Sequence, residues 1–442
     1  MISYKNFKEN IRAKNKKQNK FFRNLKLNKN IKIYNLSSVC NTVGYPAIEH
    51  TGKYFFLVLC LKDLLFFNFH YLKILFFYFF LKRIKKESFK KIENYKNNLI
   101  IENQWSLKKK KFSKTTKKLI KKKVFYDFNL QYLDFNNFLK IRMDKDFLCS
   151  LTFLKSIDLI KIFFWSIKIF LLDYKFASQQ KLKPHISIRR IFYDLTKILS
   201  LEAMLEQIPI KKYIFFWENR GWQNHFLNRY TSVFIGIQCG VEGHLGPIYC
   251  DHKMRNDLRS STIFFESKFH FNHLKNKNNK LILINKNRVF KKKNYNKKNH
   301  KVLLLTGLDR ENIILASKLV DRFKNFYLRP HPDLIPFAKQ HTSQNKIKID
   351  KINNYFFNRY DLFISLGVTS FVALMEKNNI NYLQLINPNK TIDGFDISTN
   401  KNIHLNQLEN IEKLIQKSHE MNKNKYLFVS ATKLLSYKDL KN

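Results

Sequence analysis

Glycine, proline and cysteine are all scarce in this chain. Its 442 residues include only 10 glycines, 8 prolines and 5 cysteines. An odd number of cysteines without any Cys-x-x-Cys pair argues against a disulfide framework and fits a reducing cytosol. Lysine, asparagine, isoleucine, phenylalanine and tyrosine are abundant instead, which is the bias expected of a very A+T-rich genome.

Acidic residues are also few, with 33 Asp and Glu against 82 Lys and Arg and a formal net charge of +49. Such a charge ordinarily indicates a nucleic-acid partner, and aromatic residues among the lysines of Phe112–Phe128 would suit single strands. About half of the net charge lies in residues 1–123, where Phe and Leu separate the lysine runs. An anionic membrane face is therefore as good a partner as RNA.

Long uncharged apolar runs are missing as well. Four polar residues interrupt the apolar segment Tyr54–Leu81: Lys62, Asp63, His70 and Lys73. No uncharged window of about 18 residues remains, so we favour a buried or interfacial segment over a spanning helix, which stays open. Leu151–Leu172 carries charges at helical spacing and predicts an amphipathic helix on a core or at a bilayer surface. The basic N-terminus lacks the apolar stretch and cleavage site of a secretory signal.

The region between Lys301 and Asn387 alternates strand-like and helix-like patterns. Val302–Leu305 and Leu362–Ile364 are short apolar runs typical of buried strands, and Glu311–Phe323 has apolar residues at helical spacing. This alternation predicts a parallel sheet covered by helices. Ligands of such sheets bind at the carboxyl ends of the strands.

Two motifs fall at those strand ends. They are Arg329-Pro330-His331-Pro332 and Gly367-Val368-Thr369-Ser370. Arg329 and His331 can bind an anion or stabilise a leaving diphosphate. Gly367 allows close approach, and the hydroxyls of Thr369 and Ser370 at a helix start favour phosphate. Each motif alone is compatible with an ordinary turn or N-cap, but together they predict a phosphate-bearing ligand.

A further polar group follows the strand-like run Ile214-Phe215-Phe216. Glu218 is a candidate general base for an acceptor hydroxyl, and Trp222 is a candidate for stacking on a sugar. The alternative is that Trp222 belongs to the core and Glu218 pairs with an arginine. Downstream, Glu242 and His244 lie in a glycine-rich segment that predicts a loop at a cleft rim.

In their order and spacing, these motifs resemble the surface-carbohydrate (polysaccharide) biosynthesis proteins. That family is related to the two-Rossmann-domain glycosyltransferases, which include polysialyltransferases and glycerophosphotransferases. The matching elements are Trp217–Gln223, Gly236-Ile237-Gln238, His331-Pro332, Thr369-Ser370 and Glu376. The family often has a histidine after the glutamine, where this chain has Cys239 with His244 nearby. The resemblance covers about Ile208–Asn387.

The resemblance implies an α/β fold of two Rossmann-like domains facing a cleft, the glycosyltransferase B-type, with a basic, aromatic-rich N-terminal extension. We expect four segments along the chain. They are an N-terminal region at 1–150, an acceptor-side domain at 151–268, an Asn/Lys-rich linker at 269–300 and a nucleotide-sugar-binding domain at 301–442. A strand is possible within the linker at Leu281–Ile284.

The implied function is a metal-independent glycosyltransferase-like enzyme of cell-surface polysaccharide biosynthesis, without a cofactor. It would use a nucleotide-sugar donor and a glycan or lipid-linked acceptor, in the cytoplasm at the inner face of the membrane. Glu218 and His331 would be catalytic. The donor would contact Arg329, His331, Gly367, Thr369, Ser370 and Glu376, and the acceptor Trp222, Gln238, Glu242 and His244.

Two alternatives of other classes remain. One is a nucleic-acid-binding protein that uses the basic N-terminal region. The other is a non-catalytic assembly factor with the same fold, for which the missing histidine after Gln238 is the main indication.

Overall fold

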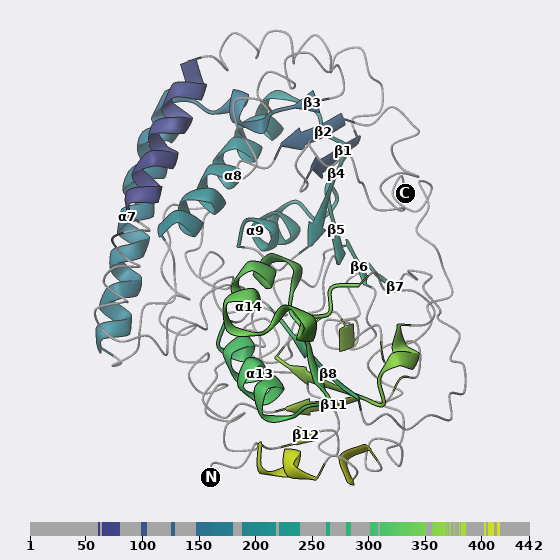
Figure 1. Cartoon of the computed structure of the whole chain (residues 1–442). Coiled ribbons are helices and arrows are strands. Elements are labelled where there is room, and N and C mark those ends of the chain that lie inside the picture. The colour runs from purple at the N-terminus through teal and green to yellow at the C-terminus, as the bar shows by residue number, and fades with distance from the viewer. Residues whose placement is uncertain are drawn as a thin grey trace.

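The computed structural model of the chain contains two parallel β-sheets, each packed against helices (Figure 1). This confirms an α/β class compatible with two Rossmann-like domains. The described residues are 61, 64–79, 99–103, 125–128, 147–179, 188–217, 221–238, 262–265, 280–283, 301–307, 310–350, 356–367, 369, 371–372, 375, 380, 382–385, 402–403, 405–410 and 413–415.

The first sheet has seven strands in the order β3-β2-β1-β4-β5-β6-β7, and every neighbouring pair is parallel. Its strands are β1 (Leu99–Asn103), β2 (Phe125–Phe128), β3 (Phe147–Leu148), β4 (Lys212–Trp217), β5 (Phe234–Gln238), β6 (Thr262–Phe265) and β7 (Lys280–Leu283).

This sheet extends past both expected boundaries of the acceptor-side domain. Three strands come from the segment 1–150, which we expected to be an extension, and β7 comes from the expected linker, at the place where a strand over Leu281–Ile284 is possible. The strands from the segment 1–150 follow or precede Lys/Asn-rich stretches. Pairing with neighbouring strands stabilises them, which the composition of that segment does not indicate.

Helices cover this sheet in two layers. The elements next to it are η3 (Ser150–Phe153), α8 (Ile188–Gln207) and α9 (Gly221–Arg229). An outer layer consists of α7 (Ser156–Gln179) and the helix 64–79, so the segment expected at 151–172 is largely helical (Figure 1). Among the described residues, no helix is both long enough and apolar enough to cross a bilayer.

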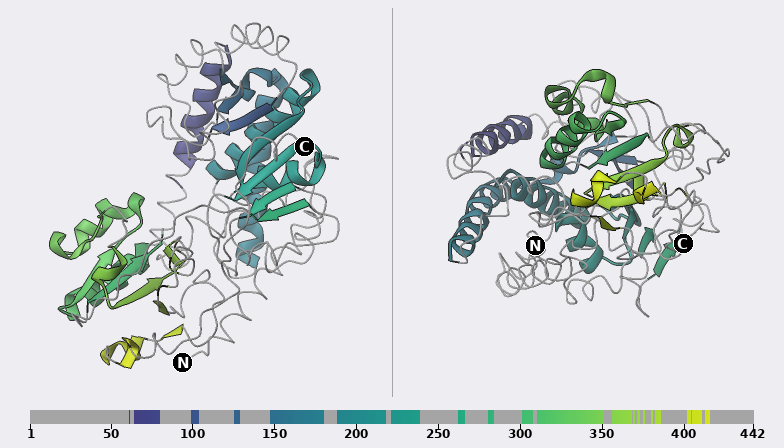
Figure 2. Two further views of the ribbon diagram at one scale, coloured as in Figure 1. Left: turned by 90° about the vertical axis from the view of Figure 1, so that its right-hand side faces the viewer. Right: turned by 60° about the horizontal axis from the view of Figure 1, so that its bottom comes forward.

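The second sheet has five parallel strands in the order β12-β11-β10-β8-β9. They are β8 (Val302–Thr306), β9 (Phe326–Arg329), β10 (Leu362–Leu366), β11 (Tyr382–Leu385) and β12 (Asn402–Ile403). The connecting helices are α13 (Arg310–Arg322), α14 (Ile335–His341), η4 (Pro332–Leu334), η5 (Gln344–Lys346), η6 (Phe357–Arg359) and η8 (Leu405–Glu409). Figure 2 shows α13 and α14 together on one face of this sheet.

Alternate residues of β8 enter two separate cores. Val302 and Leu304 pack in a cluster that also contains Ile313 and Ala316 of α13. Leu303 packs on the other face, in a cluster that includes Phe356 and Val372. Packing in these two cores fixes the strands of the second sheet relative to one another, and it thereby fixes where their carboxyl ends lie.

The first domain contains a buried ionic cluster. Glu102 and Asp127 are register partners on β1 and β2, and Lys197 of α8 forms ion pairs with both, at 3.8 Å from Glu102 Oε1. Asp127 also accepts hydrogen bonds from the Tyr213 hydroxyl at 2.7 Å and the Ser150 backbone N–H at 2.8 Å. Burial and the two carboxylates raise the pKa of Tyr213 well above its ordinary value, so the phenol stays a neutral donor.

We predict that Lys197→Met lowers the free energy of unfolding by about 3–5 kcal/mol, because it leaves two buried carboxylates without their cation. Urea denaturation followed by circular dichroism measures this change. Lys168→Met, at an exposed position on α7, is the matched control and should change stability by less than about 0.5 kcal/mol. Equal stability of the two variants would contradict the role given to the cluster.

Candidate functional site

The carboxyl ends of β9, β8 and β10 meet at one edge of the second sheet. Leu305 is the register partner of Arg329 on one side and of Ser365 on the other, and Thr306 is the partner of Leu366. Neighbouring strands lie about 4.8 Å apart, so the three strand ends span roughly 10 Å. The two motifs predicted to bind phosphate, Arg329–Pro332 and Gly367–Ser370, therefore leave the sheet at the same edge.

Arg329 is held at this edge by two aromatic rings. Its guanidinium carbon lies 4.9 Å from the centre of the Phe356 ring and 5.0 Å from that of Phe371. Nη1 donates a hydrogen bond of 3.1 Å to the backbone carbonyl of Lys348. No described carboxylate forms an ion pair with Arg329, and partial burial lowers its pKa. An oriented, partly desolvated cation of this kind is suited to bind an anion.

His331 follows two residues later and has one ring nitrogen engaged. Its Nδ1 accepts a hydrogen bond of 3.3 Å from the backbone N–H of Asp333 at the start of η4. In the neutral imidazole the proton is then on Nε2, which can donate to a ligand. Partial burial lowers the pKa of His331, with the nearby Asp333 opposing that shift, so the neutral form is favoured near pH 7.

The turn after β10 has the geometry that its sequence predicts. Gly367 has a φ of 74°, in the left-handed region that favours glycine. Thr369 is buried and its Oγ1 accepts a hydrogen bond of 3.4 Å from the backbone N–H of Phe371, as an N-cap does. Because the hydroxyl accepts in that interaction, its own hydrogen remains able to donate. Ser370 and Glu376 lie outside the described residues.

Thr306 and Asn312 are two further polar residues that the motif analysis missed. Thr306 ends β8, and Asn312 lies in the first turn of α13. Both are at most 2 % exposed, and three of their atoms, Thr306 Oγ1 with Asn312 Oδ1 and Nδ2, have no hydrogen-bond partner among the described residues. By strand alternation Thr306 faces the α13 side of the sheet. The sequence pattern that could have identified Thr306 is Thr306-Gly307 between a strand and a helix, which is similar to the turn at Gly367.

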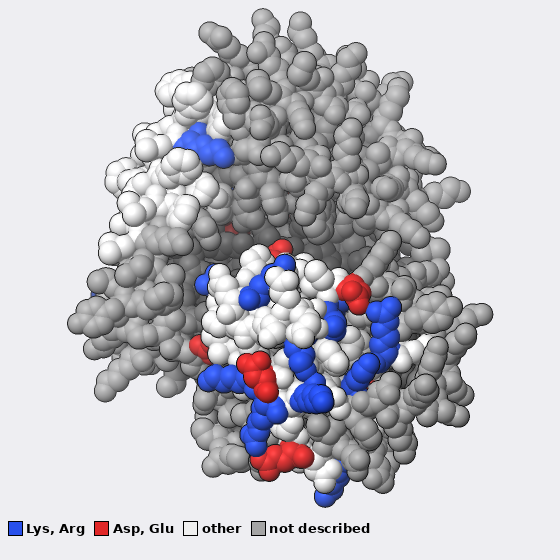
Figure 3. Space-filling view, viewed as in Figure 1, with Lys and Arg blue, Asp and Glu red and all other residues white. Residues whose placement is uncertain are grey.

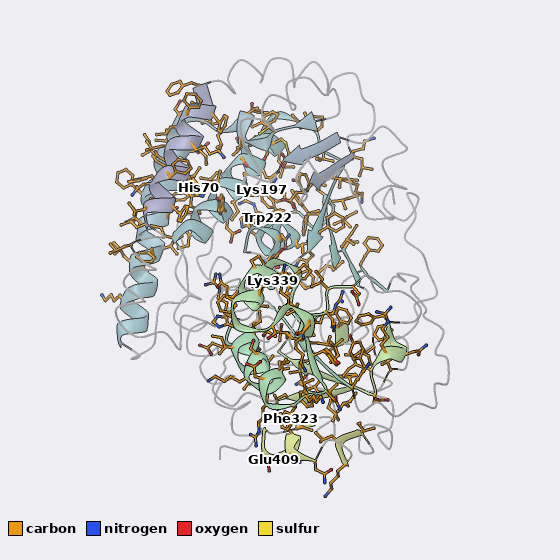
Figure 4. All side chains as sticks on the ribbon, in the orientation of Figure 1. His70, Lys197, Trp222, Phe323, Lys339 and Glu409 are labelled. Carbon is orange, nitrogen blue, oxygen red and sulfur yellow. The ribbon has the colours of Figure 1, made fainter. Side chains whose placement is uncertain are left out.

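The first sheet positions only part of the predicted acceptor side. Trp222 is 3 % exposed, packs against Phe215 at 5.1 Å between ring centres, and has the Lys197 ammonium 5.6 Å from its ring (Figure 4). This placement matches the core role left open above. Gln238 ends β5, but its side chain is not among the described ones. Glu218, Glu242 and His244 lie outside the described residues and stay predictions.

Strand packing explains why position 236 of the Gly-Ile-Gln element is a glycine. A Cβ atom at this position would lie 3.2 Å from Trp217 Cβ, which is closer than nine in ten real Cβ contacts. The indole of Trp217 donates from Nε1 to Asn224 Oδ1 at 3.1 Å and is thereby fixed. Close packing of β5 on β4 therefore accounts for this glycine without a ligand.

No protein-family model matches the sequence, and no curated protein matches it either. Among solved structures, one match is described as the "S. aureus MnaA-UDP co-structure". It is 11 % identical, with 66 % of this chain and 78 % of that chain covered and a TM-score of 0.27. A likeness at this TM-score adds nothing to the fold derived from the two sheets.

We predict that His331 titrates below pH 6.5 in the free protein and that a phosphate-bearing ligand raises its pKa, because an adjacent anion favours the imidazolium. NMR of the protein with isotope-labelled histidine measures this value. The signal is assigned by its loss in His331→Gln. A pKa at or above 6.5 without ligand, or one that UDP leaves unchanged, would contradict the geometry given to this histidine.

Proposed function

We propose that this protein is an enzyme of the glycosyltransferase class that uses a nucleotide-activated sugar, with the phosphate groups at the carboxyl edge of the second sheet. Its acceptor would be a cell-surface glycan or a lipid-linked glycan at the inner face of the membrane. In this proposal the two sheets belong to Rossmann-like domains that face a cleft.

The observation that carries the proposal is the chemistry gathered at one sheet edge. Arg329 and His331 offer N–H donors, Thr369 offers a hydroxyl, and Gly367 lets the backbone approach a ligand closely. Thr306 and Asn312 add buried polar atoms that have no partner in the described part of the chain. An unpaired buried polar atom costs about 1–3 kcal/mol, so three of them at the end of β8 and the start of α13 favour a site that a polar ligand completes.

The proposed reaction needs one proton acceptor and a stabilised leaving group. The acceptor hydroxyl gives its proton to a base, predicted to be Glu218, and its oxygen bonds to the anomeric carbon of the donor sugar. The bond from that carbon to the phosphate oxygen breaks, and the electron pair leaves with the nucleotide. Arg329 and neutral His331 donate to the departing phosphate, so we propose transfer without a metal ion.

We predict that Thr306→Val has opposite effects on stability and on ligand binding. Without ligand it should leave the protein as stable or up to about 1 kcal/mol more stable, because a buried hydroxyl without a partner is removed. Affinity for a nucleotide such as UDP should fall about 10- to 150-fold, as expected for one lost hydrogen bond to a charged group. Thermal unfolding and isothermal titration calorimetry measure the two effects.

Thr342→Val is the matched control, with the same chemical change in the same domain. Thr342 is buried and its hydroxyl donates to Ser317 Oγ at 2.6 Å, so this variant should be destabilised by about 1 kcal/mol and keep its nucleotide affinity. If no nucleotide binds the unmodified protein, the proposed function is wrong. If Thr306→Val loses stability and keeps affinity, the function can stand but this contact cannot.

A further inference from the structure

Two helices of the outer layer expose large apolar side chains to solvent. Of all large apolar residues that are exposed in the described part of the chain, only Ile349 lies elsewhere. The helix 64–79 exposes Leu64, Leu65, Phe66, Phe69, Leu72, Phe76 and Phe79, Leu61 is exposed three residues before it, and α7 exposes Ile157, Ile160, Phe164 and Leu171. We call these twelve residues the apolar face.

The exposed positions follow helical spacing on both helices. Leu65, Phe69, Leu72, Phe76 and Phe79 recur every three or four residues, and each is more than half exposed. This spacing places them on one side of the helix. The opposite side is packed, with Phe67 and Ile74 buried. The helix has sixteen residues and carries phenylalanine along its outer side. An exposed apolar surface of this kind is unusual unless a partner covers it.

The two helices lie antiparallel and form one continuous surface. The Tyr78 hydroxyl hydrogen-bonds to Ser156 Oγ at 2.9 Å, and the Tyr71 hydroxyl donates to the backbone carbonyl of Leu159 at 3.4 Å. The rings of Phe67 and Phe163 stack 5.5 Å apart between their centres. Figures 1 and 2 show the helix pair at the border of the molecule, and Figure 3 shows little charge on the part seen there.

Charge identifies the class of partner for this face. Lys161, Lys168 and Lys175 recur every seven residues on α7, beside the apolar row. Lys168 and Lys175 are exposed, and Lys161 forms an ion pair of 3.3 Å with Asp158. Lysine stems can extend along apolar surface while their ammonium groups reach lipid phosphates. A second copy of the chain would set the same lysines against this face and would itself carry a formal net charge of +49, whereas an anionic lipid surface would neutralise the lysines.

We propose that the apolar face docks on an anionic phospholipid surface, with both helices lying in the plane of the interface. Phenylalanine and leucine would enter the boundary between headgroups and acyl chains, and the lysine row would contact headgroup phosphates. The face belongs to the first domain, at the helices furthest from its sheet.

Flotation of the purified full-length protein with vesicles tests this proposal. Phosphatidylcholine vesicles with phosphatidylserine should carry the protein, and phosphatidylcholine alone should carry less. The combined variant Leu65→Gln, Phe69→Gln, Leu72→Gln and Phe76→Gln should reduce the partition coefficient by at least about tenfold. Ile349→Gln is the matched control, since Ile349 is 54 % exposed outside the face, and it should float as the unmodified protein does.

A second variant, on α7, keeps the test informative if the first variant does not fold. Phe164→Gln with Leu171→Gln should also reduce partition, with circular dichroism unchanged. In strong salt, binding should decrease but not vanish, because the apolar contacts persist when the charges are screened. The proposal is overturned if both variants float normally. It is also overturned if the protein forms a dimer in solution that these substitutions dissociate, since a second copy then covers the face.

Discussion

Parallel pairing of β9, β8 and β10 is the constraint on which the candidate site depends. The register places Leu305 opposite both Arg329 and Ser365, so the residues after each strand leave the sheet at one edge. Because of the strand order, residues that are distant in sequence lie within about 10 Å of one another at this edge. A slip of one residue in β9 would turn Arg329 away from Phe356 and Phe371 and would move Leu328 from the α13 side of the sheet to the opposite face.

The positive charge at the candidate site differs from the charge on the rest of the chain because the guanidinium of Arg329 is partly removed from water. A formal charge of +49 attracts anions at long range, but salt screens that attraction over about 10 Å. Arg329 is instead partly buried between two rings, with one N–H fixed on the Lys348 carbonyl. A cation oriented in this way selects by geometry, and nearby neutral His331 and Thr369 add donors that need no further charge.

Much of the second domain could be predicted from the sequence, because its strands are continuous apolar runs separated by turn residues. The Gly367 turn and the strand before Arg329 follow directly from that pattern. The first domain could be predicted less well, since β1 and β2 lie within Lys/Asn-rich segments, although a strand close to β7 was expected at Leu281–Ile284. Their stability comes from neighbours distant in sequence, such as the pairing of Ile100 with both Phe125 and Tyr213.

The candidate site shows the same difference. Motifs that change the backbone, such as Gly367 and the prolines around His331, are visible in a sequence. Burial is not visible, and it decides the roles of Trp222, which lies in a core, and of Asn312, whose amide has no partner in the part of the chain that the structure describes. Lys197 was likewise missed, because an ion pair buried between a helix and two strands leaves no local pattern.

The central claim is that the carboxyl edge of the second sheet binds the phosphate groups of a nucleotide. Hydrogen–deuterium exchange with and without UDP tests it most directly, since amides in contact with a ligand exchange more slowly. The account predicts protection that is confined to peptides covering residues 306–312, 329–334 and 366–372. Binding with protection elsewhere and none in these three segments would contradict it.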